Sequence, residues 1–207
     1  MNTKSIEEYI YSLENPKECK ELTINELSIT GEVQTVDLND LYNFPKLESL
    51  SLCNMTFGEN DLLILGKLEN LKVLKLYNCD FSNDNLYAYF NSIEIEELVI
   101  DNTEMNFNAI KKKYNKVIAK NVANIYDINC NELDISKAIT VDFQKLYFEK
   151  YEKLIVNKFQ YLSQKNIFIE YKNNIELVVK AEYKNFKNNA SNGTEITVKS
   201  SNIINKR

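Results

Sequence analysis

Few residues of this 207-residue chain are spaced to do chemistry. There is no histidine, which excludes Ser-His-Asp and Cys-His catalysis, histidine-containing zinc sites and histidine pH switches. Cys19, Cys53, Cys79 and Cys130 form no C-x-x-C pair, so their spacing predicts neither a zinc site nor a redox motif. We expect buried thiols at these positions rather than a disulfide framework.

Two other patterns resemble catalytic motifs without meeting their requirements. Gly58 precedes Gly66 and Lys67 at the wrong distance for the G-x-x-x-x-G-K phosphate-binding loop. Glu97 and Asp101 can share one face of a strand, but an open sheet lacks the burial that separates the pKa values of catalytic carboxylates. The sequence therefore predicts a protein that is not an enzyme and holds no cofactor and no metal.

The composition is that of an ordinary soluble globular chain. Apolar residues make up 44% and charged residues 27%. No stretch approaches the ~18 consecutive apolar residues that cross a membrane. The first residues, MNTKSIEEYIYSLEN, contain acidic side chains and no apolar segment typical of a signal peptide. We therefore expect a cytoplasmic protein of a single domain, with no membrane partner.

Charge is divided unevenly along the chain. Residues 1–103 carry a formal charge of −12 and residues 104–207 carry +7, which together give the total of −5. The basic residues are interleaved with Asn, Tyr and Ile, and the only arginine is Arg207, so nothing offers the bidentate contacts of a nucleic-acid reader. We expect no nucleic-acid partner, and the opposite charges raise the alternative of a salt-sensitive homo-oligomer.

An internal repeat of 24 residues dominates the first half of the chain. Apolar residues at positions 0, 3, 5 and 10 recur in LESLSLCNMTF (47–57), LKVLKLYNCDF (71–81) and IEELVIDNTEM (95–105). These segments resemble the L-x-x-L-x-L-x-x-[NC]-x-L motif of the leucine-rich-repeat family, and over residues 47–105 they are closest to its cysteine-containing variety. Position 8 holds Met55, Cys79 and Thr103 instead of the family's Asn, and Cys or Thr can replace it with weaker hydrogen bonds.

The resemblance implies an α/β repeat fold, a right-handed leucine-rich-repeat solenoid whose curved parallel sheet lines the concave face. Weaker copies of the motif follow the same alternation, one upstream at Ile24, Leu27 and Ile29, and others downstream that begin at Tyr114, Cys130, Tyr151, Asn174 and Gly193. In the N-terminal half we expect helical returns between strands, with Asp61 and Ser82 as helix N-caps. In the C-terminal half we expect extended or irregular returns, because residues 139–143 and 167–171 alternate with period two.

The sequence predicts a cap at the N-terminal end of the solenoid and an open edge at its C-terminal end. Residues 1–18 predict an N-terminal capping helix, with apolar Ile6, Tyr9, Ile10 and Leu13 on one face and Pro16 at its end. Residues 19–207 then form the solenoid, a single domain with its cap. The last strand, residues 195–199, would be an open edge. An alternative function is therefore structural self-association, through this edge or through the oppositely charged halves.

A binding site is expected on the concave face. Positions 3 and 5 point into the core and positions 2, 4 and 6 point outward, where apolar residues recur at Val73, Val99, Ile118, Ile155 and Val178. A row of exposed apolar residues marks a protein interaction site, whereas strand propensity and cover by long lysines would make it ordinary surface; both interpretations stay open. The candidate partner-binding residues are Lys75, Tyr77, Val99, Asp101, Ile118 and Lys120.

The fold class implies a non-enzymatic protein-protein recognition scaffold that binds a protein partner on the concave face. An adaptor of the F-box type for ubiquitin ligases is also compatible with a cysteine-containing repeat. The 23 residues that precede the expected first strand are too few for the helix bundle of such an adaptor.

Overall fold

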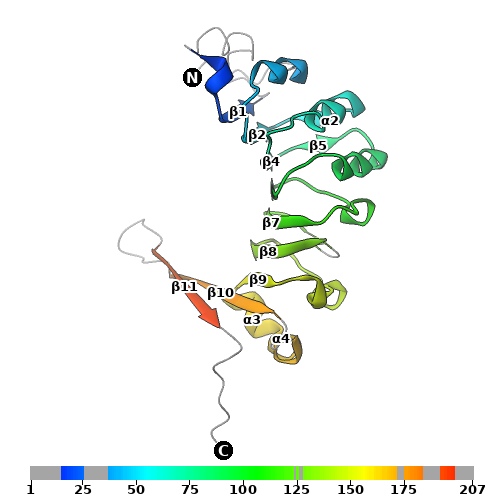
Figure 1. Cartoon of the computed structure of the whole chain (residues 1–207). Coiled ribbons are helices and arrows are strands. Elements are labelled where there is room, and N and C mark those ends of the chain that lie inside the picture. Colours follow the sequence, from blue (N-terminus) through cyan, green and yellow to red (C-terminus); the bar gives the residue numbers. More distant parts are fainter. Residues whose placement is uncertain are drawn as a thin grey trace, which may run out of the picture. The chain divides into compact units, whose positions relative to one another are not determined.

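The computed structural model describes residues 15–25, 37–123, 125, 128–171, 175–183 and 192–198. The chain divides into two compact units, Met1–Tyr114 and Asn115–Arg207. Figure 1 colours the described helices and strands by their order along the chain. The expected capping helix over residues 1–18 lies outside the described residues except at its end. There, Pro16 begins a single 3-10 turn, η1 (Pro16–Glu18), because its fixed φ angle suits the first position of a helix.

Parallel strands form the sheet of the first unit. They are β1 (Glu21–Asn25), β2 (Ser49–Cys53), β4 (Val73–Tyr77) and β6 (Glu97–Asp101), paired in that order. The register aligns Leu50 with Leu74 and Leu74 with Leu98, and all three side chains are fully buried. This confirms the inward positions of the 24-residue repeat. A second, short pairing joins β3 (Thr56–Phe57) to β5 (Asp80–Phe81).

The prediction for the upstream copy of the repeat is wrong by five residues. Strand β1 pairs Leu22 with Leu50 and Ile24 with Leu52, and it ends at Asn25. The expected inward residues Leu27 and Ile29 therefore lie beyond the strand, outside the described residues. The expected position followed from a repeat of nearly constant length, whereas 28 residues separate Leu22 from Leu50.

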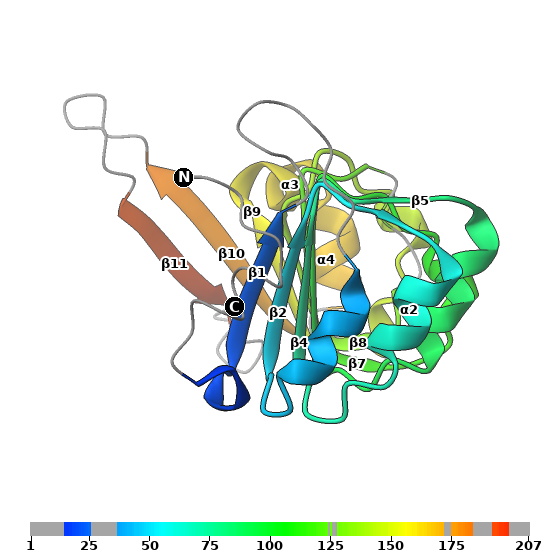
Figure 2. The ribbon, with the colours of Figure 1, turned by 90° about the horizontal axis from the view of Figure 1, so that it is seen from above.

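The returns of the first unit are helical, as predicted, and most are short 3-10 helices. They are η2 (Leu38–Asn43), α2 (Glu59–Leu65), η3 (Asp84–Asn91) and η4 (Phe107–Ala109), on one side of the strands (Figure 2). The predicted N-caps are displaced. Gly58 caps α2 and donates its N–H to Asp61 inside the helix at 2.8 Å, and Asn83, not Ser82, caps η3 by accepting from the Asn85 N–H at 3.1 Å.

Aromatic side chains fill the space between the sheet and the returns of the first unit. The rings of Phe57 and Phe81 stack with their centroids 5.3 Å apart. The Phe81 ring also meets Tyr87 at 4.9 Å and Phe90 at 5.8 Å, both from η3. Phe57 and Phe81 occupy position 10 of consecutive repeats, so the 24-residue spacing brings the two equivalent rings into contact. The contacts of Phe81 with η3 then join this return to the sheet.

The second unit continues the inward register with less regular spacing. Its strands follow in the order β7 (Tyr114–Lys120, beginning at the boundary), β8 (Cys130–Lys137), β9 (Lys153–Asn157), β10 (Glu176–Tyr183) and β11 (Asn192–Val198). Strands β8, β9 and β10 are parallel, and Leu133, Leu154 and Leu177 share one register position and are buried. The predicted downstream inward positions are therefore confirmed as far as β10.

The last strand is antiparallel, which corrects the prediction of a further parallel coil beginning at Gly193. Strand β11 pairs with β10 so that Val179 faces Ile196 and Lys180 faces Glu195. Only residues 184–191 join the two strands, and a parallel crossover needs about a dozen residues or more. The short connection therefore permits only a hairpin.

The returns of the second unit are partly helical, which corrects the expectation for residues 167–171. Between β8 and β9 lie two 3-10 turns, η5 (Phe143–Lys145) and η6 (Phe148–Lys150). Between β9 and β10 lie α3 (Lys158–Ser163) and α4 (Lys165–Tyr171), so the alternating segment at 167–171 is helical. A capping box starts α3, since Asn157 and Gln160 exchange two hydrogen bonds of 2.8 Å.

Phe168 of α4 explains why this helix forms despite its alternating sequence. Its ring is buried against Phe143 at 5.4 Å, Phe148 at 5.9 Å and Tyr161 at 5.8 Å. Tertiary packing of one aromatic residue thus decides between strand and helix for a short apolar run. The fold is α/β and repeat-like, a mostly parallel sheet with short helices in its returns.

Candidate functional site

The candidate residues of the first unit lie on the outward face of its sheet, the face opposite the buried leucines. Lys75 and Tyr77 of β4 are half-buried there. Their register partners on β2 are the small residues Ser51 and Cys53, and those on β6 are Val99 and Asp101. Tyr77 therefore has short side chains, those of Cys53 and Asp101, as its register neighbours on both strands.

The environment of Tyr77 keeps its hydroxyl group protonated. Burial raises the pKa of Tyr77, and the nearby Cys53 and Asp101 raise it further. Burial also raises the pKa of the Cys53 thiol, so this cysteine is a poor nucleophile at neutral pH. The row Cys53, Tyr77 and Asp101 thus offers apolar surface and a hydrogen-bonding tip, not an activated catalytic group.

The structure corrects the expectation that Val99 is exposed. Val99 occupies the outward position as predicted, but only 3% of it is accessible. Its Cα is paired with that of Lys75, whose long aliphatic stem on the same face can cover the smaller valine. Val99 is therefore part of the buried surface and cannot serve as an exposed anchor in this conformation.

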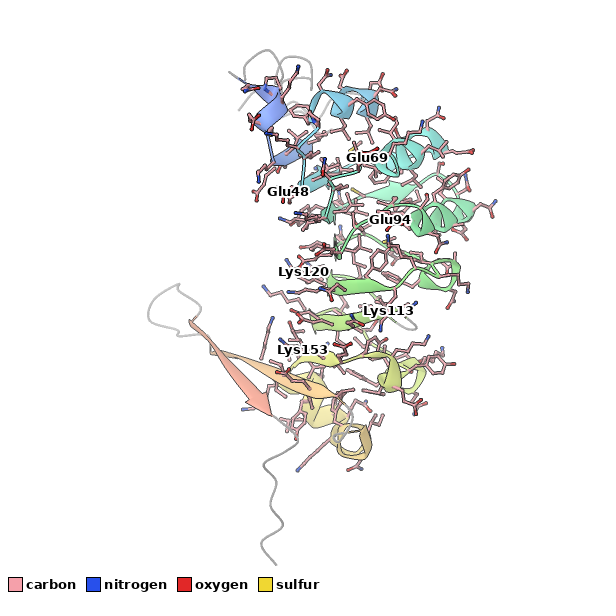
Figure 3. All side chains as sticks on the ribbon, viewed as in Figure 1. Glu48, Glu69, Glu94, Lys113, Lys120 and Lys153 are labelled. Atoms are coloured by element: carbon pink, nitrogen blue, oxygen red, sulfur yellow. The ribbon has the colours of Figure 1, made fainter. Side chains whose placement is uncertain are left out.

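Ile118 and Lys120 belong to β7, at the start of the second unit. Both are half-buried and alternate with the buried Val117 and Ala119, so they share one face of their strand (Lys120 is labelled in Figure 3). The structure thus brings Lys75, Tyr77, Val99 and Asp101 together on two adjacent strands. Ile118 and Lys120 form a separate outward pair on β7.

On the outward face of the second unit, a partly buried ion pair takes the place of an open row. Lys180 on β10 donates to Asp134 on β8 at 2.8 Å. Strand β9 lies between them, with Ile155 aligned with both Asp134 and Val178. The pair therefore spans β9 above Ile155, which is buried along with Val178. Of the two interpretations left open for the apolar row, cover by neighbouring side chains therefore holds for Ile155 and Val178, above which the long lysine reaches.

Hydrogen bonds to Asp134 stabilise its charge. Burial alone would raise the pKa of this carboxyl, but the bonds from Lys180 and Ser136, together with the charge of Lys180, outweigh it and hold the pKa below its usual value. The Ser136 hydroxyl and backbone N–H donate to Asp134 at 2.7 and 3.0 Å. Asn157 donates in turn to the Ser136 carbonyl at 2.9 Å, so the network links β8, β9 and β10.

An asparagine ladder follows the strands of the first unit, and the sequence analysis missed it. Asn54, Asn78 and Asn102 have positive φ angles of 58°, 52° and 48°. Asn102 donates to Asn78 at 2.8 Å, Asn78 to Asn54 at 2.6 Å, and Asn54 to Asn25 at 2.7 Å. The signal was present at position 7 of all three repeats, since asparagine tolerates the left-handed region that ends each strand.

Cys79 and Thr103, which stand at position 8 in place of the family's Asn, make the expected hydrogen bonds. The Cys79 thiol donates to the Leu52 carbonyl at 3.3 Å. The Thr103 hydroxyl accepts from the Cys79 N–H at 3.0 Å and lies 3.2 Å from the Asp101 carbonyl, to which it donates. No disulfide joins the four cysteines, all of which lie in described segments; Cys79 and Cys130 are buried, and Cys19 and Cys53 are half-buried.

Alternating charges line the other end of the strands. In the first unit Glu48 bonds Lys20 at 2.7 Å and Lys72 at 2.8 Å (Glu48 is labelled in Figure 3). These two lysines lower the pKa of Glu48 from 4.5 to about 2. In the second unit Glu132 contacts Lys116 at 3.2 Å and Lys153 at 3.5 Å. These carboxylates are neutralised within the sheet.

Neither a metal centre nor a membrane-spanning helix is found in the described part of the chain. Within it, no group of three or more cysteine, aspartate and glutamate side chains could hold a metal ion. None of the described helices is long and apolar enough to cross a bilayer.

Comparison of the chain with profiles of protein families, with curated proteins and with solved structures gives no match. The resemblance to leucine-rich repeats therefore rests on the motifs in the sequence.

Proposed function

We propose that the chain is a right-handed leucine-rich-repeat solenoid that works as a non-enzymatic scaffold for protein-protein recognition. A protein partner binds on the outward, concave face of the sheet. Three observations support the fold: the constant register of β2, β4 and β6, the ladder at position 7, and the hydrogen bonds at position 8. The function follows from the fold class by analogy.

The half-exposed Tyr77, between a small residue and a carboxylate, carries the site proposal. Tyrosine is enriched among the residues that dominate binding energy, because it combines a large apolar face with a polar tip. Lys75 beside it and Asp101 across from it supply charges of both signs, which would orient a partner. Because Val99 is buried, the proposed contact centres on Lys75, Tyr77 and Asp101, all of which belong to the first unit. Ile118 and Lys120 remain a separate candidate pair on β7 of the second unit.

Quantitative affinity capture from the native cell, with the whole chain as bait, tests this proposal. Tyr77→Ala should weaken capture of a specific partner by ~1 kcal/mol or more, about fivefold in affinity, with little change in the denaturation midpoint. Tyr147→Ala is the matched control, because Tyr147 is an exposed tyrosine at the start of the return η6 and belongs to neither the outward face nor any other proposed contact. If both variants capture the same proteins at wild-type levels, the outward face is not the binding site.

A further inference from the structure

Helix α3 presents two large apolar side chains to solvent. Phe159 is 80% exposed and Leu162 is 59% exposed, and their spacing of three residues places them on one helix face. Surface helices ordinarily bury their apolar face, so an exposed one marks an interaction surface. Exposed Lys158 and Lys165 flank it, and residues 158–165 contain no carboxylate. We call Lys158, Phe159 and Leu162 the α3 knob.

Contacts on the other side of α3 hold the knob in this orientation. The Gln160 side chain is buried and donates to the Ile135 carbonyl at 2.9 Å. Tyr161 stacks on the buried Phe168. Helix α3 therefore cannot roll its apolar face inward without breaking these contacts, and the knob is preorganised to meet another surface.

The first unit contains a hollow that is suited to one apolar side chain. It lies between η2 and the segment that follows α2, has a volume of about 250 Å³, and is lined by Leu41, Tyr42, Phe44, Pro45, Leu47, Lys67, Leu68, Glu69 and Asn70. Its volume is below the ~300–1,000 Å³ of sites for drug-sized ligands. Tyr42 at 48% exposure and the half-exposed Leu68 leave apolar surface at its mouth.

The charges around the hollow complement those of the knob. Residues 37–47 and 58–70, which include η2 and α2, carry five carboxylates and two lysines. Glu69 is exposed on the rim of the hollow itself (labelled in Figure 3), where Lys67 is the single opposing charge. The chain therefore carries a basic apolar knob and an apolar hollow set between acidic segments, and the charges of the two are complementary.

We propose that the hollow of one copy of this chain receives Phe159 of a second copy, with Lys158 placed against Glu69. Self-pairing of two knobs is disfavoured, because it would bring the lysines of both copies together. The knob-in-hollow contact is heterologous, so a pair of copies keeps one free knob on one copy and one free hollow on the other. Association then proceeds head to tail, at a surface separate from the outward face around Tyr77.

Sedimentation velocity of the full-length chain over a range of concentrations tests the contact. Wild type should self-associate, more weakly as the Debye length falls from ~10 Å at 0.1 M salt to ~3 Å at 1 M. Phe159→Ser should weaken association at least about tenfold, because the apolar contact is lost. Ile139→Ser is the matched control: Ile139 is 67% exposed in the same unit but lies outside the knob, so this variant should associate as wild type.

Charge exchange and mixing identify the two halves of the interface. Lys158→Glu and Glu69→Lys should each weaken association, and the two together in one chain should restore it. A mixture of Phe159→Ser and Leu68→Asp chains should stop at a one-to-one dimer, since only one knob and one hollow remain intact. Circular dichroism checks that each variant is folded, and Glu69→Lys serves as the hollow variant if Leu68→Asp is not.

Three results would overturn the proposal. They are a wild-type chain that stays monomeric up to about 1 mM, the weak end of specific association; a Phe159→Ser chain that associates as wild type; or a charge exchange that restores nothing. Tyr77→Ala should associate normally, so failure of this contact and failure of the proposed partner site are distinguishable.

Discussion

The two units share one inward pattern and differ in how regularly it repeats. In the first unit Leu50, Leu74 and Leu98 follow one another at a constant spacing of 24 residues. In the second unit Leu133, Leu154 and Leu177 are separated by 21 and then 23 residues. Constant spacing brings each residue next to its own equivalent, and this produces the asparagine ladder and the stacked Phe57 and Phe81. The first unit is therefore stabilised by contacts between equivalent residues of successive repeats.

Irregular spacing gives the second unit individual contacts instead. Asp134 and Ser136 come from β8 and Lys180 comes from β10, and together they form one network across β8, β9 and β10. That network covers the outward face, whereas the outward side chains of β2 and β4 stay half-exposed. The comparison teaches that the same register can present an open face or a closed one, depending on which side chains reach over it.

The largest expected effect tests the register that both units share. Leu74→Asp should lower the free energy of unfolding by about 4 kcal/mol, because it buries an unpaired charge in the core. Lys75→Asp, one position along β4, changes only the half-exposed outward face and should cost less than about 1 kcal/mol. Chemical denaturation measures both variants. Equal midpoints would mean that the strand is shifted by one residue.

The next effect separates the closed face from the open one. Lys180→Met leaves Asp134 buried without its cation and should cost about 2 kcal/mol, less than for a fully buried pair because Lys180 is partly exposed to solvent. Lys75→Met is the matched control at the corresponding face of the first unit and should change stability by less than about 0.5 kcal/mol. Equal losses in urea unfolding would show that the two faces do not differ in this way.

The same pair gives a pH dependence with a defined sign. Because the pKa of folded Asp134 lies below its unfolded value, its contribution to stability is present above the unfolded pKa. That contribution is lost as the pH falls through the folded pKa. In Lys180→Met the burial of Asp134 is no longer opposed by a cation, so the pKa of this carboxyl should rise towards or above its unfolded value. Urea unfolding at several pH values should therefore show that the variant loses less stability than wild type as the pH falls, so that the gap between the two chains narrows in acid.

How much of the fold the sequence predicts depends on whether neighbouring strands obey one period. The inward residues of β2, β4 and β6 follow from the 24-residue spacing, and those of β7 to β10 follow from alternation. Strand β1 was misplaced because the first repeat is longer. The direction of β11 depends on a connection too short for a crossover, and the helicity of residues 167–171 depends on the burial of Phe168. Neither appears in local periodicity.

The sequence predicts which face of the sheet the candidate side chains point to, but not how exposed they are. Position parity placed Tyr77, Lys75 and Asp101 on the outward face. The position of a residue along the strand does not determine whether neighbouring side chains cover it. That depends on how far a neighbouring lysine reaches, and Val99 and Ile155 are buried although they point outward. The asparagine ladder was readable at position 7. The family motif specifies the residue at position 8 and leaves position 7 open, so the motif does not predict the ladder.

Disrupting the ladder should have a moderate effect confined to the regular unit. Asn78→Ala removes hydrogen bonds to Asn54 and Asn102 and places alanine at a φ of 52°, at a cost of about 2 kcal/mol. Asn78→Gly loses the same bonds but accepts the backbone angle, so it should cost about 1 kcal/mol. The exposed Asn60 supplies a control, Asn60→Ala, which should be neutral. If glycine costs more than alanine in urea unfolding, the backbone angle is not what asparagine provides.

The smallest effect comes from the charge row at the other end of the strands of the first unit. The lysines beside Glu48 lower its pKa from 4.5 to about 2, so its contribution to stability is present above about pH 4.5 and is lost as the pH falls towards 2. Lys20 and Lys72 are more than half exposed, and solvent screens the interaction, which keeps the effect small. Wild type should therefore lose stability more steeply than Glu48→Gln across this pH window.

Urea unfolding of wild type and Glu48→Gln at several pH values between about 7 and 2.5 measures this difference. The gap between the two chains should be largest near neutral pH and should close in acid, because protonation removes the charge that the glutamine variant never had. In 1 M salt the gap should shrink at every pH, as the Debye length falls to ~3 Å. A gap that is independent of both pH and salt would assign the effect of the substitution to packing, and the alternating charges would then not stabilise the row.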